Sequence, residues 1–95
     1  MIVLRKVLGA ELRRRRLDAQ RTLQDVAAGA SVSFGYLSEV ERGQKEVSSE
    51  CLANICDALG CTLAGLLNAV AREVAALERA SVVALPLRDT DSAAA

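Results

Sequence analysis

The sequence predicts an all-α domain of five helices, and three features support that prediction. Apolar residues recur at intervals of three and four along most of the chain, which is the spacing of one helix face. Hydrophobic residues make up 52% of the sequence but aromatic residues only 2%, so aliphatic side chains must build the core. The single proline, Pro86, lies beyond every expected helix. At 95 residues, the chain has room for one domain and a short tail.

The first helix is expected over residues 2–18. Its inner side is predicted to carry Val3, Val7, Leu8, Leu12 and Leu17. The run from Arg13 to Arg16 places four cations around a full turn, so they cannot all face one partner. The simplest interpretation of this run is a solvated helix face.

A short second helix is expected to begin after Thr22. Leu23, Val26 and Ala27 follow Thr22 with the i, i+3, i+4 spacing of an apolar face. Asp25 stands three residues after Thr22, which is the spacing of a weak capping box. The two features together predict where this helix begins.

A third helix, also short, is expected after a tight turn. Ser33 is a suitable cap, Leu37 and Val40 share one face, and Gly43 stands where a left-handed residue ends a helix. Helices this short are not stable alone, so each must dock its apolar edge on the rest of the chain. The polar side of the third helix is then free for a partner, as in a helix–turn–helix that enters the DNA major groove.

Two further helices are expected after a polar loop. Ser48 or Ser49 caps the fourth helix and Gly60 ends it. Its apolar positions repeat at helical spacing: Leu52, Ile55, Cys56 and Leu59. A long fifth helix is expected from Thr62 to about residue 80, where the domain ends. Residues 81–95 are expected to be an irregular or disordered tail.

The fifth helix carries a heptad stripe that allows two interpretations. Its members are Leu63, Leu67, Val70, Val74 and Leu77, and Leu66 lies beside them, where it could point into the domain. In the first interpretation the whole stripe packs inside the domain. In the second, Leu67, Val70, Val74 and Leu77 pair with a second copy of the chain. A domain this small has little core with which to cover five helices, which favours the second interpretation.

The net charge is zero, but the charges are unevenly distributed. Residues 1–45 hold nine Lys or Arg and five Asp or Glu, whereas residues 46–95 hold three and seven. A basic half and an acidic half are typical of a protein with one face toward a polyanion. Zero net charge taken alone favours the alternative function, a protein-binding helical module such as an antitoxin or adaptor that acts through the fifth helix.

We expect no catalytic residues, metal or cofactor. The sequence has no histidine, and Cys51, Cys56 and Cys61 match no zinc pattern and have no base beside them. They are simplest to interpret as small apolar residues in a reducing compartment, with a redox switch as the alternative. Without a signal peptide or an apolar run of about 18 residues, a cytoplasmic protein with no membrane partner is expected.

The sequence resembles the phage-repressor-like (Cro/C1-type, XRE) helix–turn–helix family, which includes Cro and the lambda repressor. The resemblance covers about residues 5–67, and the positions that carry it are Thr22, 26–27, Ala30, 32–33, 36–38, 40–43 and 58–60. More narrowly, FGYLSEVERGQKEVSSECL is similar to the actinobacterial regulators of clp protease genes. The resemblance implies a lambda-repressor-like DNA-binding domain in a sequence-specific transcriptional regulator.

The resemblance also implies which residues meet double-stranded DNA. The expected base contacts are Ser33, Phe34, Gly35, Ser38 and Glu39. Serine hydroxyls can donate or accept, phenylalanine can pack on a thymine methyl, and glutamate can accept from cytosine N4. Glu39 could instead pair with an arginine, and Gly35 could admit the groove or only relieve crowding. The expected phosphate contacts are Arg21, Thr22, Gln24, Tyr36, Arg42, Gln44 and Lys45.

Two positions depart from the family pattern. Relatives often carry a phosphate-binding glutamine where this chain has Leu23, so Gln24 or Arg21 must supply that contact here. Many relatives carry glycine where this chain has Ser31, and serine tolerates a left-handed backbone less well. The structural ion pair of the family corresponds to Arg16 with Glu41.

The resemblance finally implies how such a protein acts. It would bind an inverted-repeat operator as a homodimer, through the fifth helix, and control protease and stress genes. RNA polymerase and Clp protease are further partners that it suggests. The terminal Ala93 to Ala95 fit a degradation signal, although a frayed tail is the simpler interpretation.

Overall fold

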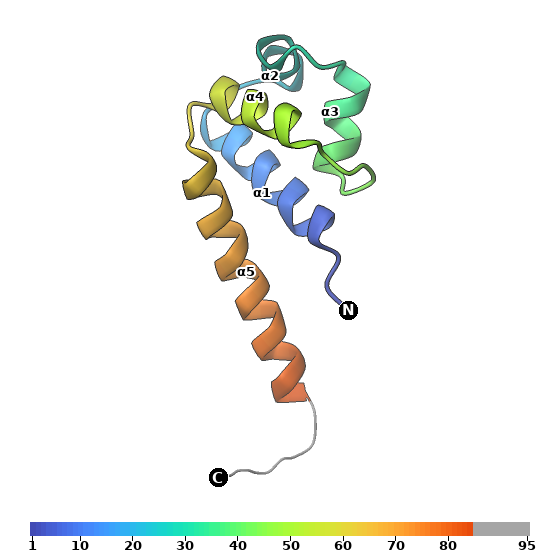
Figure 1. Cartoon of the computed structure of the whole chain (residues 1–95), viewed down its shortest axis with the longest axis vertical. Coiled ribbons are helices and arrows are strands. Elements are labelled where there is room, and N and C mark those ends of the chain that lie inside the picture. Colours follow the sequence, from blue (N-terminus) through green and yellow to red (C-terminus); the bar gives the residue numbers. More distant parts are fainter. Residues whose placement is uncertain (85–95) are drawn as a thin grey trace.

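The computed structural model describes residues 1–84, which form five helices and no strand. The first four helices pack into one body: α1 (Leu4–Asp18), α2 (Leu23–Ala30), α3 (Phe34–Glu41) and α4 (Ser49–Leu59). The fifth, α5 (Leu63–Ala84), packs against α1 and α4 and then continues beyond that body (Figure 1). The predicted five-helix, all-α fold is confirmed.

Each helix from α2 to α5 begins after a serine or threonine whose hydroxyl accepts a hydrogen bond from the backbone N–H three residues later. The four caps are Thr22, Ser33, Ser48 and Thr62, with N···O distances of 3.0–3.2 Å. Such a cap satisfies one of the free N–H groups of the first turn and contributes about 1 kcal/mol. The structure also settles the choice of cap for α4, which is Ser48.

Left-handed residues end three of these helices. Gly43 and Gly60 follow α3 and α4 with φ angles of 74° and 73°. Ser31 follows α2 with φ 57° and ψ 40° and donates its backbone N–H to Ala28. The turn between α2 and α3 therefore has the left-handed conformation for which glycine is usually chosen, although a serine occupies it.

The core is aliphatic, as expected. Its most deeply buried side chains are Leu12, Val26, Leu37, Val40, Ile55 and Leu66. Leu17, which was expected on the inner side of α1, is 50% exposed, so that expectation was wrong. The inner stripe of α1 continues from Leu12 to the position four residues on, which is Arg16. Leu17 lies one step around the helix from that stripe.

The structure corrects two expectations about α5. Val70 is only 5% exposed within a single chain, so it does not need a partner to be buried. The helix also continues to Ala84, past the boundary expected at residue 80. Residues 81–84 contain no glycine or proline, and the residue that Pro86 disfavours most in a helix is the one directly before it. The rest of the expected tail, including Ala93 to Ala95, lies outside the described residues.

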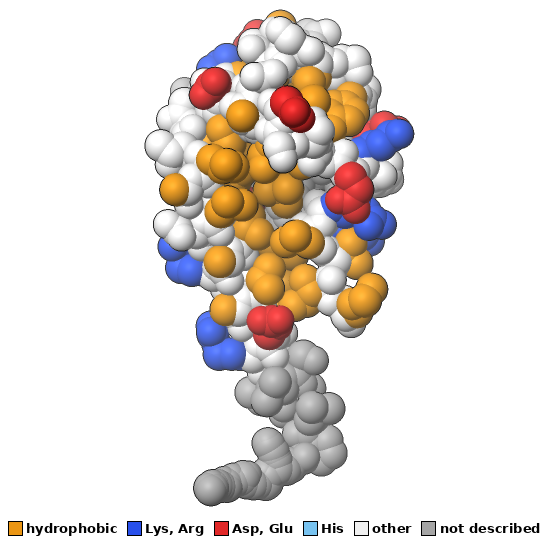
Figure 2. Space-filling view, in the orientation of Figure 1, with side chains coloured by type: hydrophobic (Ala, Val, Ile, Leu, Met, Phe, Trp, Pro, Cys, Tyr) orange, Lys and Arg blue, Asp and Glu red, His pale blue; other side chains and the backbone are white. Residues whose placement is uncertain are grey.

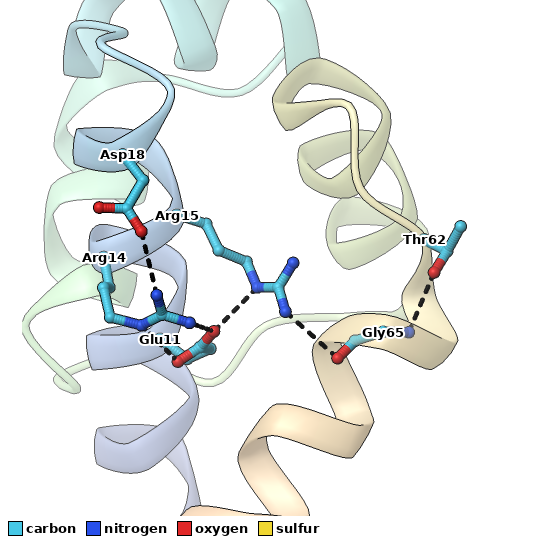
Figure 3. A network of polar contacts seen from close by, with 6 residues as sticks. All are labelled: Glu11, Arg14, Arg15, Asp18, Thr62 and Gly65. Atoms are coloured by element: carbon cyan, nitrogen blue, oxygen red, sulfur yellow. Dashed lines mark hydrogen bonds and ion pairs between the residues drawn. The ribbon is translucent and has the colours of Figure 1, made fainter.

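A polar network joins the start of α5 to α1 (Figure 3). Arg15 donates to Glu11 (2.8 Å) and to the backbone oxygen of Gly65 (3.2 Å). Arg14 also donates to Glu11, and to Asp18 at 3.0 Å. Burial of Glu11 opposes its ionisation, but the hydrogen bonds from the two arginines outweigh it and lower the pKa of this carboxyl. Within this network, the bond from Arg15 to Gly65 ties the start of α5 to α1.

Within residues 1–84, no single helix is both long and apolar enough to cross a membrane. The pair α4 and α5 meets that description jointly, by length and composition only, with a bend of 102° between them.

Candidate nucleic-acid interface

Helix α3 divides into a buried face and an open face. Leu37 and Val40 point into the core and are almost completely buried. On the other side Phe34 is 51% exposed, and Ser38 and Glu39 are partly exposed. Glu39 forms no ion pair with any residue in the described part of the chain, so its carboxylate is free to accept hydrogen bonds.

Gly35 lies on the open face of α3, and the protein itself does not require a glycine there. A Cβ built at this position would have nothing within 4 Å, so the interpretation that Gly35 relieves crowding inside the domain is contradicted. Ser33 is also exposed, and its hydroxyl oxygen caps α3 by accepting from the N–H of Tyr36. The hydroxyl hydrogen of Ser33 remains available to a partner.

The backbone of α1 lies directly against the end of α3. Gly9 is buried, and a Cβ there would lie 2.2 Å from the carbonyl oxygen of Val40 and 2.8 Å from that of Glu41. Only a residue without a side chain permits this approach. Gly9 was not among the residues expected to matter. A glycine inside a predicted helix nevertheless costs about 1 kcal/mol relative to alanine, and that cost is a signal of a packing role.

The ion pair of Arg16 with Glu41 holds the same two helices together. Arg16 Nε lies 2.8 Å from Glu41 Oε2, and its Nη2 lies 3.0 Å from Oε1. The remaining guanidinium nitrogen donates to the backbone oxygen of Arg21 at 3.0 Å. Both side chains are largely buried, and the hydrogen bond to Glu41 raises the pKa of Arg16. The pair therefore fixes the end of α3 relative to α1 and the start of α2.

The expected phosphate ligands differ in how free they are. Arg21 donates to the backbone oxygen of Ala58 (2.9 Å) and so fastens the start of α2 to the end of α4. The hydroxyl of Tyr36 donates to the backbone oxygen of Glu46 (3.2 Å). Arg42 makes one bond, from Nε to the backbone oxygen of Ser38 (3.3 Å). The other expected ligands, which are all exposed, are Thr22, Gln24, Gln44 and Lys45.

The cysteines pack in or beside the core. Cys56 is buried, and this burial, together with the neighbouring Cys61, raises the pKa of its thiol to about 11. A thiol with such a pKa is protonated at neutral pH and is a poor nucleophile. Cys51 and Cys61 are partly buried. These surroundings favour a packing role over a reactive one.

Comparisons with known proteins point to a single group. The model of the helix-turn-helix domain family matches residues 7–67. The transcriptional regulator ClgR of Mycobacterium tuberculosis is 47% identical over 77 residues, which are 81% of this chain and 69% of that protein. The crystal structure of the clp gene regulator ClgR from Corynebacterium glutamicum has 47% identity and a TM-score of 0.80, over 87% of this chain and 88% of that one.

A more distant structure shares the fold. The wild-type restriction–modification controller protein C.Esp1396I has a TM-score of 0.72 over 78% of this chain and 95% of its own. Its sequence identity is only 19%, so this likeness concerns the fold alone.

Proposed function

This chain belongs to the helix–turn–helix family of transcriptional regulators that includes ClgR, and from that premise we propose that it reads a specific double-stranded DNA sequence through α3. The observation that supports this most strongly is the open face of α3. A half-exposed phenylalanine, a glutamate that forms no ion pair within residues 1–84 and a glycine with empty space above it lie together there. Each of these features is unfavourable or unused in the isolated domain, and each has a use in a major groove.

In the proposed complex the open face of α3 lies along the base edges. Phe34 packs on a thymine methyl, and Glu39 accepts from a cytosine amino group. Gly35 allows the helix backbone to approach the groove floor. Lys45 and the other exposed polar residues around α3 contact phosphates, which positions the domain but does not read the sequence.

Two substitutions on α3 are expected to relax sequence specificity. Phe34→Ala or Glu39→Ala should reduce the discrimination at one operator position by about 1–3 kcal/mol, because each removes one base contact. Lys45→Ala should instead weaken binding to every duplex alike. The operator is first selected from a random duplex pool with the wild-type chain. Affinities for the operator and its single-base variants are then measured by fluorescence anisotropy. Equal losses on all duplexes for all three variants would show that α3 does not read the bases.

We also propose that two copies associate through α5 and bind an inverted repeat. Leu67 and Leu77 of the heptad stripe are 48% and 39% exposed, and Val74 between them is partly buried. Apolar side chains gather in a band that runs down the molecule onto the part of α5 that leaves the body (Figure 2). A second α5 would cover these side chains. Two domains related by a two-fold axis suit half-sites about 34 Å apart.

Changing Leu67→Glu together with Leu77→Glu is expected to produce a monomer. The dimer dissociation constant should rise at least about tenfold, because each buried leucine is worth about 1.5–3 kcal/mol. Sedimentation velocity over a concentration series measures this. Leu17→Glu is the matched control, since it places the same charge at a similarly exposed leucine outside α5. A wild-type chain that sediments as a monomer at all concentrations would contradict the dimer.

For the target genes we propose those of the Clp protease and the stress response, since the ClgR protein of Corynebacterium glutamicum, which is 47% identical, is described as a clp gene regulator. Contacts with RNA polymerase and turnover by Clp protease belong to the same proposal. The selected operator provides the test, because it should occur upstream of clp genes in the host genome.

A further inference from the structure

The loop between α3 and α4, residues 43–48, has no helix or strand of its own to hold it. It begins at Gly43, whose φ of 74° turns the chain out of α3, and it ends at Ser48, the cap of α4. Gln44 and Lys45 lie near its start, and both side chains are exposed. Both are expected phosphate ligands, so the conformation of this loop decides where they are presented to DNA.

The first turn of α1 packs against the start of this loop (Figure 1). A Cβ built at Gly43 would lie 2.8 Å from the Cα of Lys6, so the two backbones are in close contact. Arg5 donates from Nε to the backbone oxygen of Gly43 at 3.1 Å, and from Nη1 to a carboxylate oxygen of Glu46 at 3.4 Å. Arg5 therefore holds the loop at two points, one before and one after the two expected phosphate ligands.

Tyr36 holds the same loop from the side of α3. Its hydroxyl donates to the backbone oxygen of Glu46 at 3.2 Å. Burial, and then the neighbouring Cys51, raise the pKa of this phenol, so it is protonated and able to donate at neutral pH. Val47, the next residue of the loop, packs against the hydrophobic core. The loop is thus fastened on both sides of its two exposed ligands.

Of the two bonds that Arg5 makes, the one to Gly43 contributes more to the order of the loop. The side chains of Arg5 and Glu46 are 42% and 82% exposed, and ion pairs so exposed contribute little to stability. Gly43 is buried, and a buried backbone oxygen needs a donor, which Arg5 supplies. The ion pair has a different effect. It places a cation beside Glu46, whose charge would otherwise repel a DNA backbone near Lys45.

We propose that Arg5 and Tyr36 are positioning residues, which hold the loop so that Gln44 and Lys45 meet the DNA backbone. The inference rests on the proposed function. It adds Arg5, which was not among the residues expected to matter, and it assigns the hydroxyl of Tyr36 to the loop instead of to a phosphate. A loop that is ordered before binding loses less entropy in the complex, so both residues strengthen binding to every sequence alike.

A double-mutant cycle on the full chain tests whether Arg5 acts through the loop. Affinity for a random-sequence duplex at low salt is measured by fluorescence anisotropy for four proteins. They are the wild type, Arg5→Met, a loop variant with Gln44→Ala and Lys45→Ala, and the variant with all three changes. Arg5→Met alone is expected to weaken binding about three- to tenfold, which corresponds to the loss of one hydrogen bond. In the loop variant the same change should weaken binding less than about twofold, because the contacts that Arg5 positions are already absent.

Two further variants distinguish this role from a general loss of folding. Tyr36→Phe removes one hydroxyl and keeps the ring, and it is expected to weaken binding only while Gln44 and Lys45 are present. Arg72→Met makes the same substitution as Arg5→Met at an exposed arginine of α5. It is the matched control and should leave affinity unchanged in both backgrounds.

The outcomes separate this inference from the proposed function. If Arg5→Met weakens binding equally in both backgrounds, or not at all, the inference is wrong and the proposed function stands, and the same criterion applies to Tyr36→Phe. If the loop variant binds as tightly as the wild type, the loop contacts no DNA and the inference is again wrong. If the wild-type chain binds no duplex even at low salt, both proposals fail.

Discussion

Replacing Arg16 with methionine is expected to lower the free energy of unfolding by about 3–5 kcal/mol. The substitution leaves the Glu41 carboxylate without a cation at a site where its side chain is only 5% exposed. It also removes the donor to the backbone oxygen of Arg21, which orders the start of α2. Urea denaturation followed by circular dichroism measures the destabilisation. Because these contacts orient α3, affinity for the operator should fall as well.

The double variant with Arg16→Met and Glu41→Leu distinguishes two energies. One is the attraction lost between Arg16 and Glu41, and the other is the cost of leaving Glu41 buried without a cation. Replacing both partners of a buried pair by apolar residues is often neutral, so most of the stability should return. Exposed ion pairs typically contribute less than about 1 kcal/mol. A destabilisation below that amount for Arg16→Met alone would mean that the pair is solvated and would contradict the prediction.

Gly9→Ala is expected to destabilise the domain by about 1–3 kcal/mol or more, as over-packing of a close contact does. The new methyl group would meet two backbone oxygens, at 2.2 Å from that of Val40 and 2.8 Å from that of Glu41. No side-chain rotation can relieve a clash with backbone, so α1 must move away from α3. The same urea experiment measures this effect.

Gly35→Ala is the matched control, since it makes the same change in a helix where the added methyl group meets nothing. It should leave stability unchanged or raise it by up to about 1 kcal/mol, because alanine is the better helix former. If Gly9→Ala proved no more harmful than Gly35→Ala, the close contact of α1 with α3 would be disproved.

The helix boundaries could be predicted because their causes are local. Ser33 caps α3 through a bond to an N–H only three residues away, and Gly43 ends the helix by its own left-handed backbone. The identity and spacing of these few residues are enough to predict such a helix boundary. Helix α5 is longer than expected because residues 81–84 contain no residue that breaks a helix.

The arrangement of α1 could not be predicted in the same way. That Arg16 lies beside Glu41 depends on how α1 packs against α3, where Gly9 allows the two backbones to approach closely. The inner stripe passes through Arg16 and leaves Leu17 exposed, which hydrophobic spacing alone cannot indicate. Val70 is buried for the same kind of reason, by contacts that the heptad pattern does not specify.

The most direct test of DNA reading by α3 is a titration of the ¹⁵N-labelled chain with its selected duplex, followed by amide chemical shifts. We expect the largest changes on residues 33–39, with a second group around Leu23 at the start of α2. Saturable binding that changes the amide chemical shifts of α5 alone, and leaves those of α3 unchanged, would contradict DNA reading by α3.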